Sequence, residues 1–188
     1  NLFIDESADL SMALDIAINA KLQKPSVCNA VENLLIHSNF KNAGQLLSGL
    51  KSAGAELHGC TRSRALSSEV IPIENEDEEY AMEYLDNRLS VKVVDSVEEA
   101  VSFIHRYGSS HSEAIVSENK KTIESFSAGV DSAAVFINCS TRFHDGGQMG
   151  MGAEVGISTQ RLHVRGPMGV RDLTTTTYVM TGDGQIRK

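Results

Sequence analysis

The sequence has few cysteines and no long apolar run, and each absence excludes a class of protein. Its three cysteines, Cys28, Cys60 and Cys139, show no CxxC spacing, and no histidines are paired at zinc spacing. Neither a disulfide framework nor a metal site is therefore expected, and a reduced, cytoplasmic setting fits best. No apolar run reaches the roughly 18 residues that a membrane-spanning helix needs, so no membrane partner is expected.

A basic stripe is also absent. The formal net charge is -8 and the isoelectric point is near 5.2. Proteins that bind nucleic acid usually carry clustered lysine and arginine, so no nucleic-acid partner is expected. The densest charged run, 74–79, is acidic, and we expect it to be a solvated loop or the start of a helix.

What is present describes an ordinary globular chain. The 188 residues are 41% hydrophobic and 22% charged, and the chain is long enough to bury a core. It begins without methionine on an apolar stretch, 1–4, that has the character of a strand. We therefore expect it to be a piece of a longer protein, with one domain or one domain and an appendage.

Helical and strand-like patterns alternate along the first 137 residues. Such alternation is typical of an α/β protein in which parallel strands are joined by crossover helices. The apolar run 133–137 is the candidate for the central strand. The predicted helices cover about 7–23, 43–53, 97–107 and 120–128, and the predicted strands cover 34–37, 56–58, 90–94, 114–116 and 133–137.

The character of the sequence changes after Asn138, where glycines crowd together. We divide the chain into a catalytic domain, 1–150, and a Gly-rich C-terminal segment, 151–188. Within that segment 174–181 is rich in Thr, Tyr and Val and has no following helix to bury it. It is predicted to be an edge strand that pairs with another chain or domain.

Cys28 is the residue whose position suggests chemistry. It lies in a short connection between a helix and a strand, among small and polar residues. Position alone does not decide its role, because free cysteines are often buried and inert. A nucleophilic Cys28 also needs a dipole or a cation nearby, since an ordinary thiol is mostly protonated at neutral pH.

Several segments, in collinear order, resemble the gamma-glutamyl phosphate reductases (glutamate-5-semialdehyde dehydrogenases) of the aldehyde dehydrogenase superfamily. They are KPSVCNAVE at 24–32, NCSTRFHDGG at 138–147, GAEVGISTQ at 152–160 and HVRGPMG at 163–169. The resemblance covers nearly the whole chain and is weakest between Cys60 and Glu79. The departures are modest: the family often has Glu and an aromatic where this chain has Gln148 and Met149, and Ala at Cys139.

The resemblance implies a fold and a reaction. The fold would be an aldehyde dehydrogenase-type catalytic domain, a mostly parallel three-layer sheet with helices on both faces, ending in an oligomerisation strand. The reaction would be NADPH-dependent reduction of L-glutamyl 5-phosphate to L-glutamate 5-semialdehyde with release of phosphate, through a cysteine thioester. The NADP-binding half would lie outside this chain, which would be inactive alone. A homo-oligomer and a functional link to glutamate 5-kinase are also implied.

Seven residues are candidates for the site, and several have a structural alternative. Arg142 suits a carboxylate or phosphate but can equally form a structural ion pair. Asn29 is more easily explained as structural and His111 as an exposed loop residue, while for Glu83 a surface glutamate is an equal alternative. The candidates are Cys28 as the nucleophile, Asn29, His111, Ser140, Thr141 and Arg142 for the substrate, and Glu83 for the ribose of NADPH.

Three other readings of function stay open. The chain could be the reductase half of a bifunctional pyrroline-5-carboxylate synthase. It could be a cysteine hydrolase or acyltransferase, with Cys28 and a histidine as a dyad, or a non-enzymatic assembly module that pairs through 174–181. Faster alkylation of Cys28 than of Cys60 and Cys139 would favour a tuned nucleophile.

Overall fold

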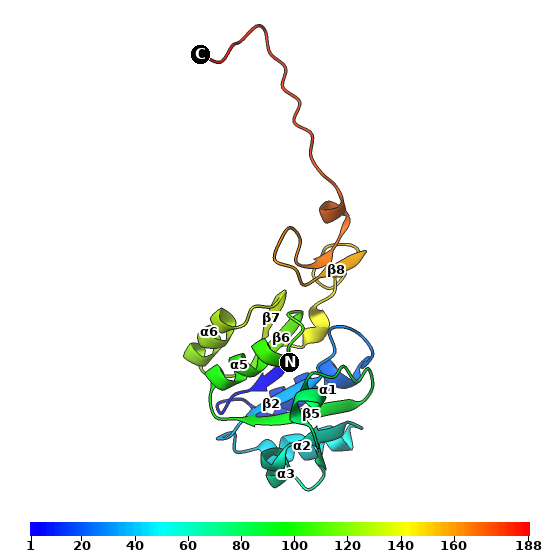
Figure 1. The fold of residues 1–188 in the computed structure, drawn as a ribbon, viewed down its shortest axis with the longest axis vertical. Coiled ribbons are helices and arrows are strands. Elements are labelled where there is room, and N and C mark those ends of the chain that lie inside the picture. The colour runs from blue at the N-terminus through cyan, green and yellow to red at the C-terminus, as the bar shows by residue number, and fades with distance from the viewer.

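A seven-stranded sheet with helices on both faces forms the body of the protein. The computed structural model describes residues 1–188 (Figure 1). The strand order is β4-β3-β5-β2-β1-β6-β7, and all neighbouring strands run parallel. The strands are β1 (Leu2–Ile4), β2 (Asn33–His37), β3 (Glu56–Gly59), β4 (Ile71–Pro72), β5 (Arg88–Val94), β6 (Ser112–Val116) and β7 (Ala134–Ile137). The helices are α1 (Leu10–Leu22), α2 (Ala43–Ser52), α3 (Thr61–Leu66), α4 (Glu76–Tyr80), α5 (Val97–Tyr107) and α6 (Lys120–Gly129).

The central strands are buried on both faces. Leu2 and Ile4 of β1 belong to the apolar cluster under α1 and α2, whereas Phe3 belongs to the cluster under α5 and α6. Successive side chains of a strand point to opposite faces, so a strand covered on both sides becomes a continuous apolar run. The two clusters make three layers, as the resemblance implied.

Side-chain caps set where the helices begin. Asp9 accepts a hydrogen bond from the Met12 N–H at 2.8 Å, so α1 begins at Leu10, three residues after the predicted start. The hydroxyl of Ser96 caps α5 in the same way, at the Glu99 N–H. α5 spans the residues predicted for it, and the acidic run 74–79 contributes to the short helix α4.

The prediction that 133–137 is the central strand is wrong. β7 pairs only with β6 and lies at the edge of the sheet, while β2 is central. Its side chains are only partly covered, and Ile137 is 44% exposed. An apolar run predicts a strand but does not show how many strands pair with it. The central position was therefore wrongly predicted. The short elements α3, α4 and β4 were not predicted as such.

The last 50 residues lie outside the sheet. A 3-10 turn, η1 (Thr141–Phe143), leads to an antiparallel hairpin of β8 (Gly156–Ser158) and β9 (Gly166–Met168), followed by η2 (Val170–Leu173). Residues 174–188 form neither helix nor strand within the chain and extend away from the body (Figure 1). Pairing of 174–181 with another chain therefore stays a prediction, as does the domain boundary at residue 150.

Candidate active site

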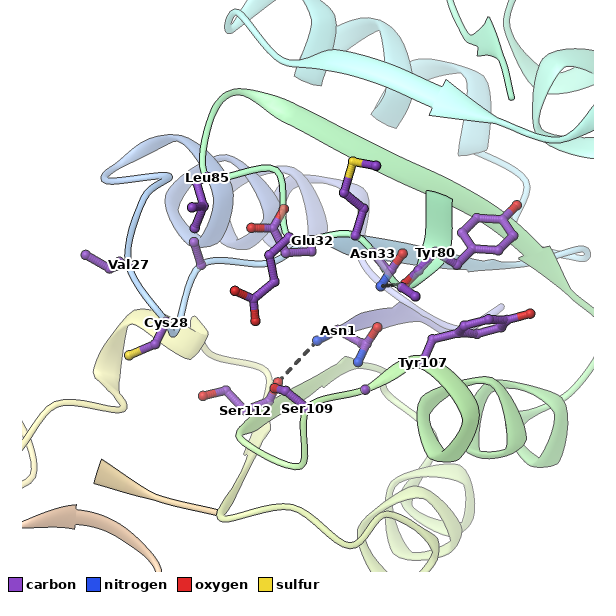
Figure 2. A pocket seen from close by; sticks show the side chains of 15 residues that line it. Asn1, Val27, Cys28, Glu32, Asn33, Tyr80, Leu85, Tyr107, Ser109 and Ser112 are labelled. Carbon is purple, nitrogen blue, oxygen red and sulfur yellow. Dashed lines mark hydrogen bonds between the residues drawn. The ribbon is translucent and has the colours of Figure 1, made fainter. Parts of the chain in front are cut away.

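A pocket of about 240 Å³ lies at the amino edge of the sheet (Figure 2). Asn1 directly precedes β1, while Asn33 and Ser112 begin β2 and β6, and all three line it. Cys28 and Glu83 line the same pocket from the segments that lead into β2 and β5. Open parallel sheets usually bind ligands at their carboxyl edge. This pocket lies at the other edge, because the segments that precede the strands form its walls.

Cys28 is exposed in a tight turn after α1. Pro25 prevents the helix from continuing, and the Ala30 N–H donates to the Val27 carbonyl at 2.9 Å. The Val31 N–H then donates to the Ala20 carbonyl at 3.0 Å, which attaches the end of the turn to α1. The thiol is therefore presented by a loop fixed at both ends.

The resting thiol of Cys28 is not activated. Burial raises its pKa above the ordinary value, and the carboxylate of Glu154 raises it further. The backbone N–H groups of Cys28 and Asn29, and the guanidinium of Arg142, act in the opposite direction but do not outweigh these effects. A backbone dipole and a cation, both expected near a nucleophilic Cys28, are thus present. Neither lowers the pKa of the thiol enough to offset burial and Glu154.

Asn29 fastens the Cys28 turn to the segment that follows β7. Its side-chain N–H donates to the His144 carbonyl at 3.0 Å, and its side-chain oxygen accepts from Arg142. The Thr141 hydroxyl donates to the Asn29 carbonyl at 2.6 Å. Because the amide is buried and used at both ends, this geometry favours the structural interpretation of Asn29.

Arg142 faces a neighbouring pocket rather than the one that Cys28 lines. That pocket, of about 280 Å³, is also lined by Asn19, Gln23 and Asp145. The Arg142 Nε donates to Gln23 at 2.9 Å. Ser140 is buried, and its hydroxyl accepts from the Arg142 N–H at 3.2 Å. The structure thus gathers Asn29, Thr141 and Arg142 behind the Cys28 turn.

His111 lies beneath the pocket and does not line it. It is buried, and so is His144, whose ring centroid is 4.3 Å from that of His111. The Ser112 hydroxyl is 2.7 Å from the Nδ1 atom of each ring and lines the pocket itself. Burial lowers the pKa of His111, and burial together with His111 lowers the pKa of His144 to about 4. Both rings are therefore neutral at pH 7.

The sequence analysis missed Ser112 and His144. A signal for His144 was available, because it lies within the NCSTRFHDGG segment. It also missed a buried ion pair, in which the Lys21 Nζ lies 2.6 Å from a carboxylate oxygen of Glu32. Lys21 is fully buried, and Glu32 lines the same pocket as Cys28. Burial lowers the pKa of Lys21 and raises that of Glu32, while each partner opposes the other's shift.

Comparison with known proteins shows what the chain is similar to. The gamma-glutamyl phosphate reductase of Bacillus cereus (strain ATCC 10987 / NRS 248) is 53% identical over 190 residues, which cover 100% of this chain. That of Leptospira interrogans is 53% identical over 187 residues. The crystal structure of gamma-glutamyl phosphate reductase from Thermotoga maritima covers 100% of the chain at a TM-score of 0.91 and 46% identity. The chain is similar along its whole length to part of the gamma-glutamyl phosphate reductases.

The chain spans less than half the length of these relatives. It covers 45% of the Bacillus cereus reductase, 44% of the Leptospira interrogans reductase and 45% of the Thermotoga maritima structure. No family model matches it. An acetylating aldehyde dehydrogenase from Geobacillus thermoglucosidasius shares the fold at a TM-score of 0.73 and 18% identity. The expected aldehyde dehydrogenase-type fold is therefore confirmed.

Two kinds of feature are absent from the structure. No group of three or more His, Cys, Asp or Glu side chains is arranged to hold a metal ion. None of its helices combines the length and apolarity needed to cross a bilayer. The pocket shared by Cys28 and Glu83 is lined by no lysine or arginine, and the guanidinium of Arg142 lines the neighbouring pocket.

Proposed function

We propose that this chain is the catalytic part of an NADPH-dependent reductase that converts L-glutamyl 5-phosphate to L-glutamate 5-semialdehyde and phosphate. The observation that carries the proposal is the 53% identity to gamma-glutamyl phosphate reductases over the whole chain. The geometry adds support, because the only exposed cysteine lies in a fixed turn that lines a pocket. An exposed thiol in a pocket can reach a substrate carbonyl.

In the first step Cys28 acts as the nucleophile. Its sulfur attacks the acyl carbon of the substrate, the bond from that carbon to the phosphate oxygen breaks, and phosphate leaves with the bonding electrons. The backbone N–H groups near the sulfur can stabilise the oxygen anion of the tetrahedral intermediate. Because the resting pKa of Cys28 is raised, bound substrate would have to favour the thiolate before the attack.

The second step reduces the thioester. NADPH, when bound, supplies the hydride that goes to the thioester carbon. The exposed carboxylate of Glu83 lines the same pocket and can accept hydrogen bonds from ribose hydroxyls. The resulting thiohemiacetal then collapses, the carbon–sulfur bond breaks, and a proton returns to Cys28 as the aldehyde leaves.

Arg142 is the proposed anchor for a negative group of the substrate. Its Nη2 makes no hydrogen bond within the chain, although Nε and Nη1 are engaged by Gln23 and Asn29. A guanidinium with one free edge can bind a carboxylate or phosphate oxygen. Ser140 and Thr141 would keep Arg142 and Asn29 in place, and His111 would act through Ser112 rather than by touching the substrate.

The remaining parts of the proposal concern the whole protein. The relatives are more than twice as long as this chain, so most contacts to NADPH would come from residues outside it, and residues 1–188 alone would be inactive. We propose a homo-oligomer joined through 174–181 and a cytoplasmic enzyme. Its substrate would be supplied by an acyl-phosphate-forming kinase such as glutamate 5-kinase, because an acyl phosphate hydrolyses easily and must be made shortly before use.

The first test compares the wild type with Cys28→Ser in the full-length enzyme. The reaction is run in reverse with glutamate 5-semialdehyde, phosphate and NADP, and the nicotinamide absorbance is followed. We expect phosphate-dependent formation of NADPH by the wild type and a loss of at least about a thousandfold in the variant, because the nucleophile is gone.

Cys60→Ser is the matched control and should keep full activity, since Cys60 is buried away from the pocket. Full activity of Cys28→Ser would assign the nucleophile elsewhere. Ester hydrolysis without nucleotide would instead favour a cysteine hydrolase, and no activity in any assay would favour an assembly module.

A further inference from the structure

The buried Lys21–Glu32 pair beside the pocket has no part in the proposed chemistry. Lys21, on α1, is 0% exposed, yet its ammonium lies 2.6 Å from the carboxylate of Glu32. Two charges removed from water seldom stabilise a fold more than an apolar pair of the same size would. The reason for this pair must therefore be sought in what it holds in place.

Both members of the pair contact the segment 82–85 that carries Glu83. The Lys21 ammonium lies 5.7 Å from the centre of the Tyr84 ring. The Arg88 guanidinium also lies over this ring, at 4.9 Å. The carboxylate of Glu32 lies beside the backbone N–H groups of Tyr84 and Leu85, which favour its charged form. The ion pair thus lies against both the Tyr84 ring and the backbone of this segment.

The segment needs such support. Leu85 has a φ of 58°, in the left-handed region that a branched side chain adopts only when its surroundings enforce it. Tyr84 is buried, and its hydroxyl donates to Glu79 at 2.5 Å. The residues on either side of Tyr84, Glu83 and Leu85, both line the pocket. Anchoring Tyr84 and Leu85 therefore fixes where Glu83 faces the ligand.

Glu32 also connects this wall of the pocket to the wall formed by the Cys28 turn. It comes directly before β2, four residues after Cys28, and lines the same pocket (Figure 2). We propose that the Lys21–Glu32 pair is a positioning device that sets Glu83 against Cys28, and so determines how tightly the nucleotide is bound. The inference rests on the proposed function, in which Glu83 holds the nucleotide ribose.

The test uses the full-length enzyme with Glu32→Gln. A glutamine has one acceptor and one donor, so it cannot accept from Lys21 and from the backbone N–H groups together. We expect the KM for NADP in the reverse reaction to rise about tenfold, the loss of one charge-assisted hydrogen bond, while kcat stays within about twofold. The NADP concentration that half-protects Cys28 from iodoacetamide should rise by the same factor.

A second variant separates positioning from stability. In Lys21→Met/Glu32→Gln no buried charge is left unpaired, so its Tm should exceed that of Glu32→Gln. If Glu32 positions the nucleotide wall, the KM for NADP stays raised in the double variant although the Tm recovers. A KM that returns to the wild-type value together with the Tm would overturn the inference, as would an unchanged KM in Glu32→Gln.

Arg62→Gln is the matched control, because it breaks the exposed Arg62–Asp95 pair far from the pocket and should change neither KM nor protection. The protection assay needs no turnover, so it keeps the two proposals apart. An enzyme without phosphate-dependent activity would refute the proposed reaction, while a shifted protection curve in Glu32→Gln would still support positioning. Failure of NADP to protect wild-type Cys28 would overturn the inference itself.

Discussion

At the scale of single residues, one thiol is accessible and a different thiol has the lowered pKa. Cys28 is exposed, but burial of its sulfur and the nearby Glu154 raise its pKa. Burial also raises the pKa of Cys60, yet the Ser63 hydroxyl and backbone N–H groups outweigh it and the net pKa is lowered. Cys60 is nevertheless enclosed, at 8% exposure. In the free protein the accessible thiol of Cys28 therefore has a raised pKa, whereas the thiol of Cys60 has a lowered pKa but is enclosed.

Replacing Glu154 tests this electrostatic restraint. In Glu154→Gln the negative charge is gone, while the side-chain oxygen that accepts the Gly146 N–H at 2.9 Å is retained. We expect the pKa of Cys28 to fall and its alkylation by iodoacetamide at pH 7 to become faster. The measurement is the alkylation rate of Cys28 as a function of pH, by mass spectrometry. Glu118→Gln, at the opposite edge of the sheet, should leave the midpoint unchanged; an equal midpoint in Glu154→Gln would refute the role of Glu154.

The site residues that could be predicted from the sequence are those marked by short local segments. Cys28 and Glu83 were chosen because segments around them resemble a known family, and both line one pocket. Ser112 could not be found in this way, because its role depends on two rings at 111 and 144. Asn29 was placed in the substrate site from its position beside Cys28, whereas its contacts are with residues more than a hundred positions later.

At the scale of elements, a buried histidine bridge joins β6 to the segment after η1. The Ser112 hydroxyl can satisfy one nitrogen of each ring, and the Nε2 atoms of His111 and His144 have no partner. Protonating either ring would place a charge in buried surroundings, where the carboxylates of Glu113 and Glu154 favour it at His111 less than burial opposes it, and where burial and His111 both oppose it at His144. The bridge is stable only while both rings are neutral.

This bridge makes the stability of the protein depend on pH. The folded-state pKa of His144, about 4, lies below the ordinary value of 6.5, so its contribution is fully present above pH 6.5 and is lost as the pH falls toward 4. Between pH 7.5 and pH 5 the loss should amount to about 2 kcal/mol, from roughly 1.4 kcal/mol for each pH unit between 6.5 and 5. Urea denaturation at pH 7.5 and pH 5 measures it.

His144→Gln should be less stable than the wild type at pH 7.5. Its free energy of unfolding should nevertheless fall less between pH 7.5 and pH 5 than that of the wild type. His105→Gln, on the exposed face of α5, should lose as much as the wild type does. A pH dependence that is the same in His144→Gln and in the wild type would show that the bridge does not carry it.

The elements that could be predicted are those with a local signal at their ends. α5 was predicted to the residue, because Ser96 caps it and Gly108 follows its last turn. The β8–β9 hairpin was missed, since three-residue strands built around glycines show no alternation of apolar side chains. The position of β7 at the edge of the sheet depends on which strands pair, which composition does not encode.

At the scale of the whole molecule, exposed apolar side chains gather in the part that follows the sheet. Tyr178, Val179 and Met180 are each more than four-fifths exposed. An extended segment with free backbone groups and apolar side chains suits pairing with the edge of another sheet. This arrangement supports the proposed homo-oligomer.

Charges placed in this segment should disrupt the oligomer. We expect the full-length enzyme with Val179→Asp and Met180→Asp to shift to a smaller species in analytical ultracentrifugation, because neither carboxylate can be buried without a partner. Its far-UV circular dichroism should be unchanged, since no helix or sheet contact within the chain is lost. Lys188→Asp is the control at the exposed end. An unchanged sedimentation coefficient would rule out this segment as the interface.

The position of β1 in the sheet has a consequence for how the chain is made. Leu2 pairs with Leu34 on one side and with Ala114 on the other, so its second neighbour is synthesised much later than its first. At roughly 5 to 20 residues per second, β1 stays an apolar open edge for several seconds on the ribosome. During that interval the open edge is available for pairing with another copy of the chain. Correct folding of the nascent chain therefore depends on protection of that edge during translation, and not only on the final stability of the sheet.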